Sequence, residues 1–159
     1  MFVLSVIFTF NSKANIQITS KMKVKTKKNI FRSDCPISSA LDLFGDKWSL
    51  LVIRDLVYFG ERTFKDFSGA AENISSARLS DRLCKLESLE LVIKSNHPTN
   101  KKVYLYTLTP KGMDLFPVIA EYVKWSNKYL NEHIAEPAKE FAKNLEKDRE
   151  GTLNKFMKR

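Results

Sequence analysis

The sequence has few of the residues from which catalytic and metal sites are usually built. Its 159 residues include two cysteines, Cys35 and Cys84, and two histidines, His97 and His133. The cysteines lie far apart and the histidines complete no ligand spacing, so the sequence predicts neither a disulfide framework nor a metal site. It also has no glycine-rich phosphate loop and no serine nucleophile elbow. We therefore expect a protein that is not an enzyme and that binds no cofactor.

Long apolar runs are equally scarce. Residues 1–10 form an apolar run, but a membrane-spanning helix needs about 20 such residues. The run also lacks the basic leading region and the cleavage site of a signal peptide. We therefore expect no membrane partner and, because unpaired cysteines suit a reducing compartment, a cytoplasmic protein.

The first 33 residues are expected to form a flexible basic extension. Met22 opens a lysine-rich stretch that suits a native start, so residues 1–21 are candidates for non-native sequence upstream of it. We expect them to pack little against the domain. Residues 21–32 are predicted to be a flexible arm, with contact to nucleic-acid phosphates as the alternative.

Acidic residues are outnumbered by basic ones. Lysine and arginine total 27 against 18 aspartates and glutamates, which gives a net charge of +9. Such a balance suits a polyanionic partner, although charge alone does not separate DNA, RNA and an anionic membrane. The hydrophobic fraction of 43% is ordinary for one domain with a buried core.

The most informative stretch is residues 73–92, which predicts an amphipathic helix over residues 75–90. Leu79, Leu83 and Leu86 share one stripe of such a helix, and Ser75 stands at its start as a cap. By itself a leucine stripe describes most surface helices. The opposite face is small and polar, and it comprises Ala77, Arg78, Asp81, Cys84, Lys85 and Ser88.

The flanking segments suggest what this helix does. Residues 63–67 predict a short capped helix with Phe64 and Phe67 facing inward. Residues 92–96 and 103–109 predict two strands around a basic hairpin tip at residues 97–102. Short helix, turn, long helix and basic hairpin follow one another in a winged helix-turn-helix. The expected fold is therefore mainly α-helical with a small β-hairpin wing.

Further helices are predicted on both sides. Pro36 opens a helix that Gly45 ends, and a second helix, capped by Asp46 and ended by Gly60, is apolar nearly all round and therefore central. After Thr109, Pro117 is expected to kink or divide a helix with a wide apolar stripe. We expect this helix, around residues 122–130, and the N-terminal helix at residues 37–44 to form the dimer interface. Residues 132–159 carry sparse apolar residues among charges, which predicts a solvated helix that frays into a charged tail.

Five short motifs occur in one order and at fitting distances. They are Cys35-Pro36; Gly45-Asp46-Lys47-Trp48; Phe64-Lys65-Asp66-Phe67; Ile74-Ser75 with Leu79-Ser80, Arg82-Leu83 and Leu86-Glu87; and Tyr106-Thr107-Leu108-Thr109-Pro110-Lys111-Gly112. Together they resemble the HxlR-type winged helix-turn-helix transcriptional regulators, and they place the domain at residues 34–131. The resemblance implies a bacterial homodimer that binds double-stranded DNA through the helix at 75–90 in the major groove and the wing at 97–102 on the backbone or minor groove.

Two departures from the family pattern limit what is carried over. Glu90 replaces the glycine that commonly follows the recognition helix, so either that residue is left-handed or the helix runs on. The wing lacks the usual Pro-Pro-Arg, so its lysines are expected to contact phosphate only. The residues that we assign to DNA contact are Ser75, Ser76, Ala77, Arg78, Ser80, Asp81, Arg82, Lys85, Thr99, Asn100, Lys101 and Lys102.

The alternative function is a thiol-based sensor of oxidants or electrophiles. Cys35 lies at a helix N-terminus, where the helix dipole favours a thiolate, and in some members of the resembled family an N-terminal cysteine has this role. A packed, unreactive thiol is the competing interpretation. In the sensor hypothesis DNA binding is either the output or incidental, and the effector is an oxidant or another small molecule.

Overall fold

The structure, a computed structural model, describes residues 31–157. The predictions for the apolar run, for Met22 and for nearly all of the basic arm therefore lie outside the described residues. Across the described part of the chain, no helix combines the length and the apolar character needed to cross a membrane.

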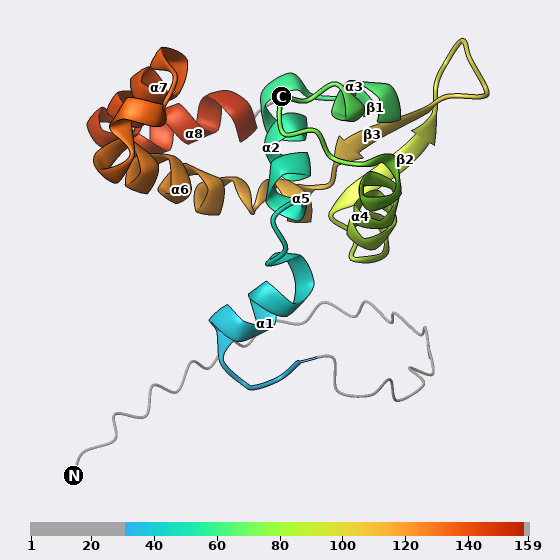
Figure 1. Cartoon of the computed structure of the whole chain (residues 1–159), viewed down its shortest axis with the longest axis horizontal. Helices are drawn as coiled ribbons and strands as arrows, with labels where there is room; N and C mark the ends of the chain where they lie inside the picture. Colours follow the sequence, from blue (N-terminus) through green and yellow to red (C-terminus); the bar gives the residue numbers. More distant parts are fainter. Residues whose placement is uncertain (1–30, 158–159) are drawn as a thin grey trace, which may run out of the picture. The chain divides into compact units, whose positions relative to one another are not determined.

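The described chain is mainly helical with one small antiparallel sheet (Figure 1). Its elements are α1 (Pro36–Phe44), α2 (Ser49–Phe59), β1 (Arg62–Thr63), α3 (Phe64–Ser68), α4 (Ser76–Ser88), β2 (Val92–Asn96), β3 (Tyr104–Leu108), α5 (Pro110–Met113), α6 (Phe116–Tyr129), the 3-10 helix η1 (Asn131–His133), α7 (Glu136–Lys147) and α8 (Arg149–Met157). The strand order is β1-β3-β2. This arrangement confirms the predicted fold class.

Strand β1 was not predicted. It has two residues, Arg62 and Thr63, which pair with Tyr106 and Leu105 of β3. A segment this short shows no alternation of apolar and polar residues, so only its tertiary pairing reveals it. The hairpin itself was predicted correctly, since Val92 pairs with Leu108 and Asn96 with Tyr104.

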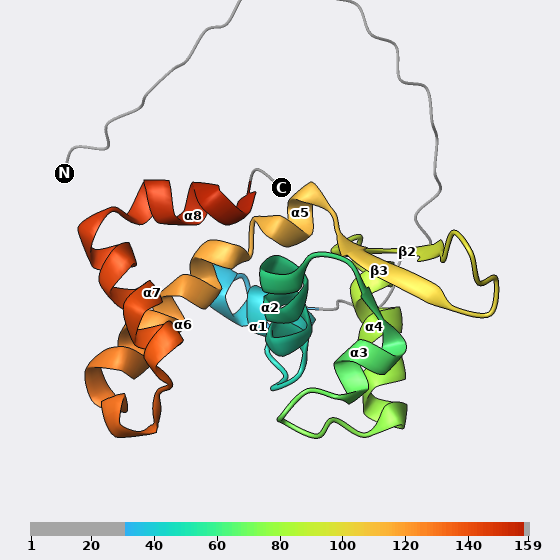
Figure 2. The ribbon, with the colours of Figure 1, turned by 90° about the horizontal axis from the view of Figure 1, so that it is seen from above.

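Helix α2 is the centre of the domain, as its apolar composition predicted. Figure 2 shows it between the C-terminal helices on one side and the α3–α4 pair on the other, and it contacts α4, α5, α6, α8, β1 and β3. Val52, Ile53, Leu56 and Val57 are buried on it. Because apolar burial is the main favourable term in folding, α2 holds the flanking elements in one core.

The ends of the helices follow the predicted local signals. Thr63 and Asp66 form a capping box at α3, in which the Asp66 amide donates to the Thr63 hydroxyl and the Thr63 amide donates to the Asp66 carboxylate. The predicted break near Pro117 is confirmed. Helix α5 ends at Met113, and Pro117 lies in the first turn of α6, where it costs no hydrogen bond.

The prediction of a solvated, fraying C-terminal segment was wrong for the described residues. Helices α7 and α8 bury Leu145 and Leu153, which are 2% and 5% exposed. Phe141 and Phe156 meet Tyr58 of α2 and Phe116 of α6 in a cluster with ring centroids 5.3 to 6.1 Å apart, a range in which aromatic pairs attract. The apolar residues are sparse, but two helices bring them to one surface.

The C-terminal helices are thus part of the core, and truncation of a buried side chain there should destabilise the whole domain. Replacement Leu145→Ala is expected to lower the free energy of unfolding by about 2–5 kcal/mol, because it removes buried methyl groups and leaves a cavity. Urea unfolding followed by circular dichroism measures this change. The control Lys143→Ala, at an exposed position of the same helix, should stay within about 0.5 kcal/mol. If Leu145→Ala changes the free energy of unfolding as little as Lys143→Ala does, α7 does not contribute to the stability of the core.

Candidate nucleic-acid interface

Helix α4 presents a polar first turn to the solvent. Ser76, Ala77 and Arg78 are exposed, whereas Leu79 on the inner side has no exposed surface. Ser75 occupies the N-cap position as predicted, but its side chain makes no capping hydrogen bond. The apolar stripe is therefore buried, and the exposed first turn presents two small residues, Ser76 and Ala77, beside the long side chain of Arg78.

The C-terminal end of α4 is held by the segment that follows the sheet. Glu90 lies in the left-handed region with φ of +58°, so the helix ends at Ser88 and does not run on. The strain of a side chain there costs about 1 kcal/mol. The Lys111 ammonium donates to the Leu89 carbonyl at 2.7 Å, and the Thr109 hydroxyl donates to the Glu90 carbonyl at 2.7 Å. These bonds satisfy carbonyls at the helix end.

Gly112 explains why this segment packs so closely against the turn after α4. A Cβ atom at this position would lie 2.1 Å from the backbone oxygen of Leu91. Any side chain would push the Thr109–Lys111 contacts away from the helix end. The Thr-Pro-Lys-Gly motif thus holds the C-terminal end of α4 in place.

The hairpin tip carries the second set of predicted residues. Thr99, Asn100, Lys101 and Lys102 are all exposed there, and Figure 1 shows the tip projecting beyond the strands. The Asn100 side-chain oxygen accepts from the Lys102 amide at 3.1 Å, which closes the turn. The two lysine side chains are consequently presented on an ordered loop.

Lys94 in β2 is a basic residue that the sequence analysis did not single out. It is exposed, and its ammonium lies 4.0 Å from the ring centroid of Tyr104 on the neighbouring strand. A cation over an aromatic face is attracted by the ring. Only the pairing register of the hairpin could have indicated Lys94, because it brings side chains of β2 and β3 together. The spacing of residues within one strand does not reveal this register.

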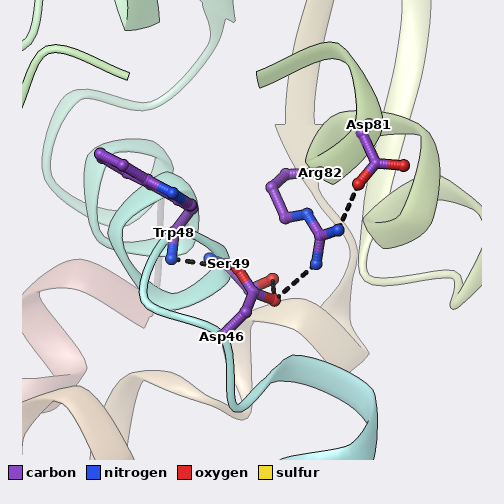
Figure 3. A network of polar contacts seen from close by, with 5 residues as sticks. All are labelled: Asp46, Trp48, Ser49, Asp81 and Arg82. Carbon is purple, nitrogen blue, oxygen red and sulfur yellow. Dashed lines mark hydrogen bonds and ion pairs between the residues drawn. The ribbon is translucent and has the colours of Figure 1, made fainter. Parts of the chain in front are cut away.

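Arg82 and Lys85 differ from the other predicted contact residues because both are half-buried, whereas the rest, Ser80 and Asp81 included, are exposed. The Arg82 guanidinium donates to the Asp46 carboxylate at 2.9 Å and also pairs with Asp81 (Figure 3). Arg82 is therefore paired with two carboxylates of the protein itself.

Asp46 is the acceptor for several donors at once. Its carboxylate accepts from the backbone amides of Trp48 and Ser49, both at 3.1 Å, and from the Ser49 hydroxyl at 2.6 Å, besides Arg82 (Figure 3). Partial burial raises the pKa of Asp46, but the hydrogen bonds from Ser49 and Arg82 outweigh it and hold this pKa below the ordinary value of 3.8. The N-cap residue of α2 is Trp48 and not Asp46 as predicted, but the Asp46 carboxylate binds the amides of Trp48 and Ser49 at the start of the helix, and it stays ionised.

Both cysteines are exposed and unpaired. Cys35 occupies the N-cap position of α1, which fits its predicted place at a helix N-terminus. Cys84 lies on α4, outside the leucine stripe. Among the described residues, no group of three or more histidine, cysteine, aspartate or glutamate side chains could hold a metal ion.

Comparison with known sequences decides the family. Residues 43–134 match the HxlR-like helix-turn-helix family, a span that exceeds half of the chain. The chain belongs to this family. The predicted resemblance is confirmed, and the HxlR-like match contains α2 to α6, the wing and η1. Helices α7 and α8 lie outside it.

The HxlR-like chain has several bacterial relatives that are named as transcriptional regulators and not as enzymes. It is 33% identical over 105 residues to the uncharacterized HTH-type regulator MT3179 of Mycobacterium tuberculosis, covering 65% of this chain and 64% of that one. It is 33% identical over 99 residues to YvaP of Bacillus subtilis, covering 61% and 90%. The match thus spans less than two thirds of the mycobacterial relative.

Solved structures support the same fold. The reduced form of the transcriptional regulator YodB from B. subtilis superposes with a TM-score of 0.50 at 33% identity, covering 66% of this chain and 98% of that one. The redox regulator HypR in its oxidized form superposes with a TM-score of 0.54 at 24% identity, covering 59% and 96%. The HypR likeness shows the fold alone.

Proposed function

We propose that this protein is a sequence-specific DNA-binding regulator that acts as a homodimer, with α4 in the major groove. The observation that best supports this proposal is the exposed first turn of α4, Ser76 to Arg78, opposite a leucine stripe that is buried in the core. A major groove about 12 Å wide admits a helix with such a face. The net charge of +9 supports attraction to DNA.

The predicted contacts divide into two kinds. Arg78 stands where a recognition helix reaches base edges, and a guanidinium donates two hydrogen bonds to guanine. Lys101 and Lys102 at the projecting tip carry compact charges that suit phosphate or the adjacent minor groove. The exposed Ser75, Ser76, Ser80, Thr99 and Asn100 add hydrogen-bonding groups of either kind.

A second copy of the chain is the proposed partner of the apolar groove beside α6. This groove has a volume of about 810 Å³ and is lined by residues of α1, α2 and α6, by residues 45–47, which include Asp46, and by Ile134 and Ala138. Ile37 is 71% exposed, and Tyr122, Trp125 and Tyr129 are 56%, 56% and 59% exposed. Ile37 and Tyr122 line the groove, and Trp125 and Tyr129 add exposed aromatic surface on the same helix as Tyr122. Large exposed apolar surface is typical of an interface. Two-fold symmetry would let two α4 helices address two half-sites.

Replacement of Arg78 and replacement of Lys101 should affect DNA binding differently, the first in its sequence preference and the second in its salt dependence. Arg78→Ala is expected to cost about 1–3 kcal/mol on a duplex selected by the wild type from a random pool, and to leave binding to random duplex nearly intact. Lys101→Ala should weaken both duplexes alike and reduce the slope of log affinity against log salt by about one. Salt titrations of each variant on both duplexes measure this. Equal weakening of both duplexes by Arg78→Ala would make Arg78 a phosphate contact only.

A charge on the α6 face should break the dimer. The wild type is expected to sediment at micromolar concentration with twice the chain mass of 18.4 kDa, and Trp125→Glu as a single chain, because a carboxylate is costly to bury in an apolar interface. Asn144→Glu adds the same charge at an exposed position of α7 and should remain dimeric. A wild-type monomer that binds DNA tightly would refute the dimer.

Exposed Cys35 favours a second function, the sensing of oxidants as an input to DNA binding. It lies at the N-cap of α1, whose residues line the proposed dimer groove, so a bulkier or charged sulfur there would disturb the interface. The likeness to the reduced form of the transcriptional regulator YodB supports a response to oxidation and reduction.

Peroxide is therefore expected to weaken DNA binding by the wild type and not by Cys35→Ser. Gel-shift titrations before and after treatment measure this, with Cys84→Ser as the matched control because Cys84 is the other exposed cysteine. The control should respond as the wild type does. An equal response of wild type and Cys35→Ser, or none in either, would remove the sensor function.

A further inference from the structure

Arg82 is the basic residue of α4 whose surroundings least resemble those of a DNA contact. Its side chain is 22% exposed and is bound by Asp46 and Asp81, whereas Arg78, one turn earlier, is exposed. Two carboxylates beside one guanidinium leave little net positive charge there for a phosphate. Arg82 therefore needs a different explanation from Arg78, although both are arginines of one helix.

The partner carboxylate is fixed to α2. Asp46 accepts from two backbone amides and one hydroxyl at the start of that helix, and the Ser49 that supplies the hydroxyl is fully buried. With these donors in place the carboxylate has little freedom to move. A guanidinium bound to it is held at a defined place relative to α2.

The leucine stripe of α4 supplies packing but no directional bond between α4 and α2. Leu79, Leu83 and Leu86 hold α4 against the core by close packing, but apolar burial has no preferred bond direction of its own. A charge-assisted hydrogen bond has a preferred distance and direction. It is made here from Arg82, in the second turn of α4, directly after the exposed first turn.

We infer that Arg82 is a positioning residue: its bond to Asp46 sets the orientation of α4 on α2, and so the place at which Ser76, Ala77 and Arg78 meet the bases. This assignment replaces the direct DNA contact predicted for Arg82 from the sequence. It rests on the proposed function, because it names a residue that determines the specificity of the same helix. Loss of either partner removes the same restraint.

The test compares Arg82→Gln, Asp46→Asn and the double replacement on two duplexes. One duplex is selected by the wild type from a random pool, and the other has random sequence. Each single variant should bind the selected duplex about tenfold more weakly, as expected for one lost hydrogen bond to a charged group. Random-duplex affinity should change less than twofold, the salt slope should stay unchanged, and the double variant should be no weaker than either single one.

A phosphate-contacting Arg82 predicts opposite signs for the two partners. Arg82→Gln would then weaken both duplexes and lower the salt slope by about one, as Lys101→Ala does. Asp46→Asn would instead strengthen binding, because it removes a negative charge and releases the guanidinium. Either result overturns the inference.

Two further variants separate positioning from a general loss of structure. Arg82→Lys keeps the charge and one bond to Asp46 and should recover most of the preference for the selected duplex. Glu72→Gln breaks the ion pair between Glu72 and Arg54, 2.5 Å long, which joins α2 to the segment before α4 and involves no residue of α4. It should leave the preference unchanged. An equal loss of preference in Glu72→Gln would reduce Arg82 to an ordinary stabilising contact.

Amide hydrogen exchange without DNA tests the effect of the Arg82–Asp46 bond on α4 separately from the proposed function. Exchange of the hydrogen-bonded amides in the first two turns of α4, which begin at Leu79, should accelerate to the same extent in Arg82→Gln and Asp46→Asn. Unchanged exchange in both variants would overturn the positioning role. If the wild type selects no duplex while exchange responds as expected, the proposed function fails and the role of Arg82 in holding α4 stands.

Discussion

Burial of α2 on nearly all sides is the constraint on which the rest of the structure depends. Helix α2 buries Val52, Ile53, Leu56 and Val57 and contacts α4, the sheet, α6 and α8, so each of these elements is placed by its contact with one helix. Because the core is close-packed, a change on one side of α2 is felt on the other. This arrangement connects the proposed dimer face at α6 with the proposed reading face at α4 through one helix.

Environment separates residues that look equivalent in the sequence. Arg78 and Arg82 lie on the same helix, four residues apart, yet one is exposed and the other is bound between two carboxylates. The same distinction applies to the polar groups at the two ends of α4. Ser75 makes no capping bond, whereas Thr109 and Lys111 hold the C-terminal carbonyls. The structure thus leaves the first turn of α4 open and secures its other end.

Local patterns predicted most of the elements correctly. The leucine spacing predicted α4, Pro36 and Gly45 bounded α1, Thr63 marked the cap of α3, and Pro117 marked the division between α5 and α6. These signals act within one or two turns of helix, where propensity, capping and periodicity are properties of neighbouring residues. The same patterns, taken in order, indicated the HxlR-like family that the comparison confirms.

Contacts between distant residues were decided by the tertiary structure alone. The Asp46–Arg82 bond joins positions 36 apart, β1 exists only through its pairing with β3, and the sparse apolar residues of α7 and α8 become core because Tyr58 and Phe116 lie where two helices can cover them. The sequence by itself determined most helices of the HxlR-like domain, the hairpin and the basic character of its tip. The packing of α4 against α2 decided that Arg82 is bound and Arg78 is exposed, because the identity of a residue does not determine which distant residue folding places beside it.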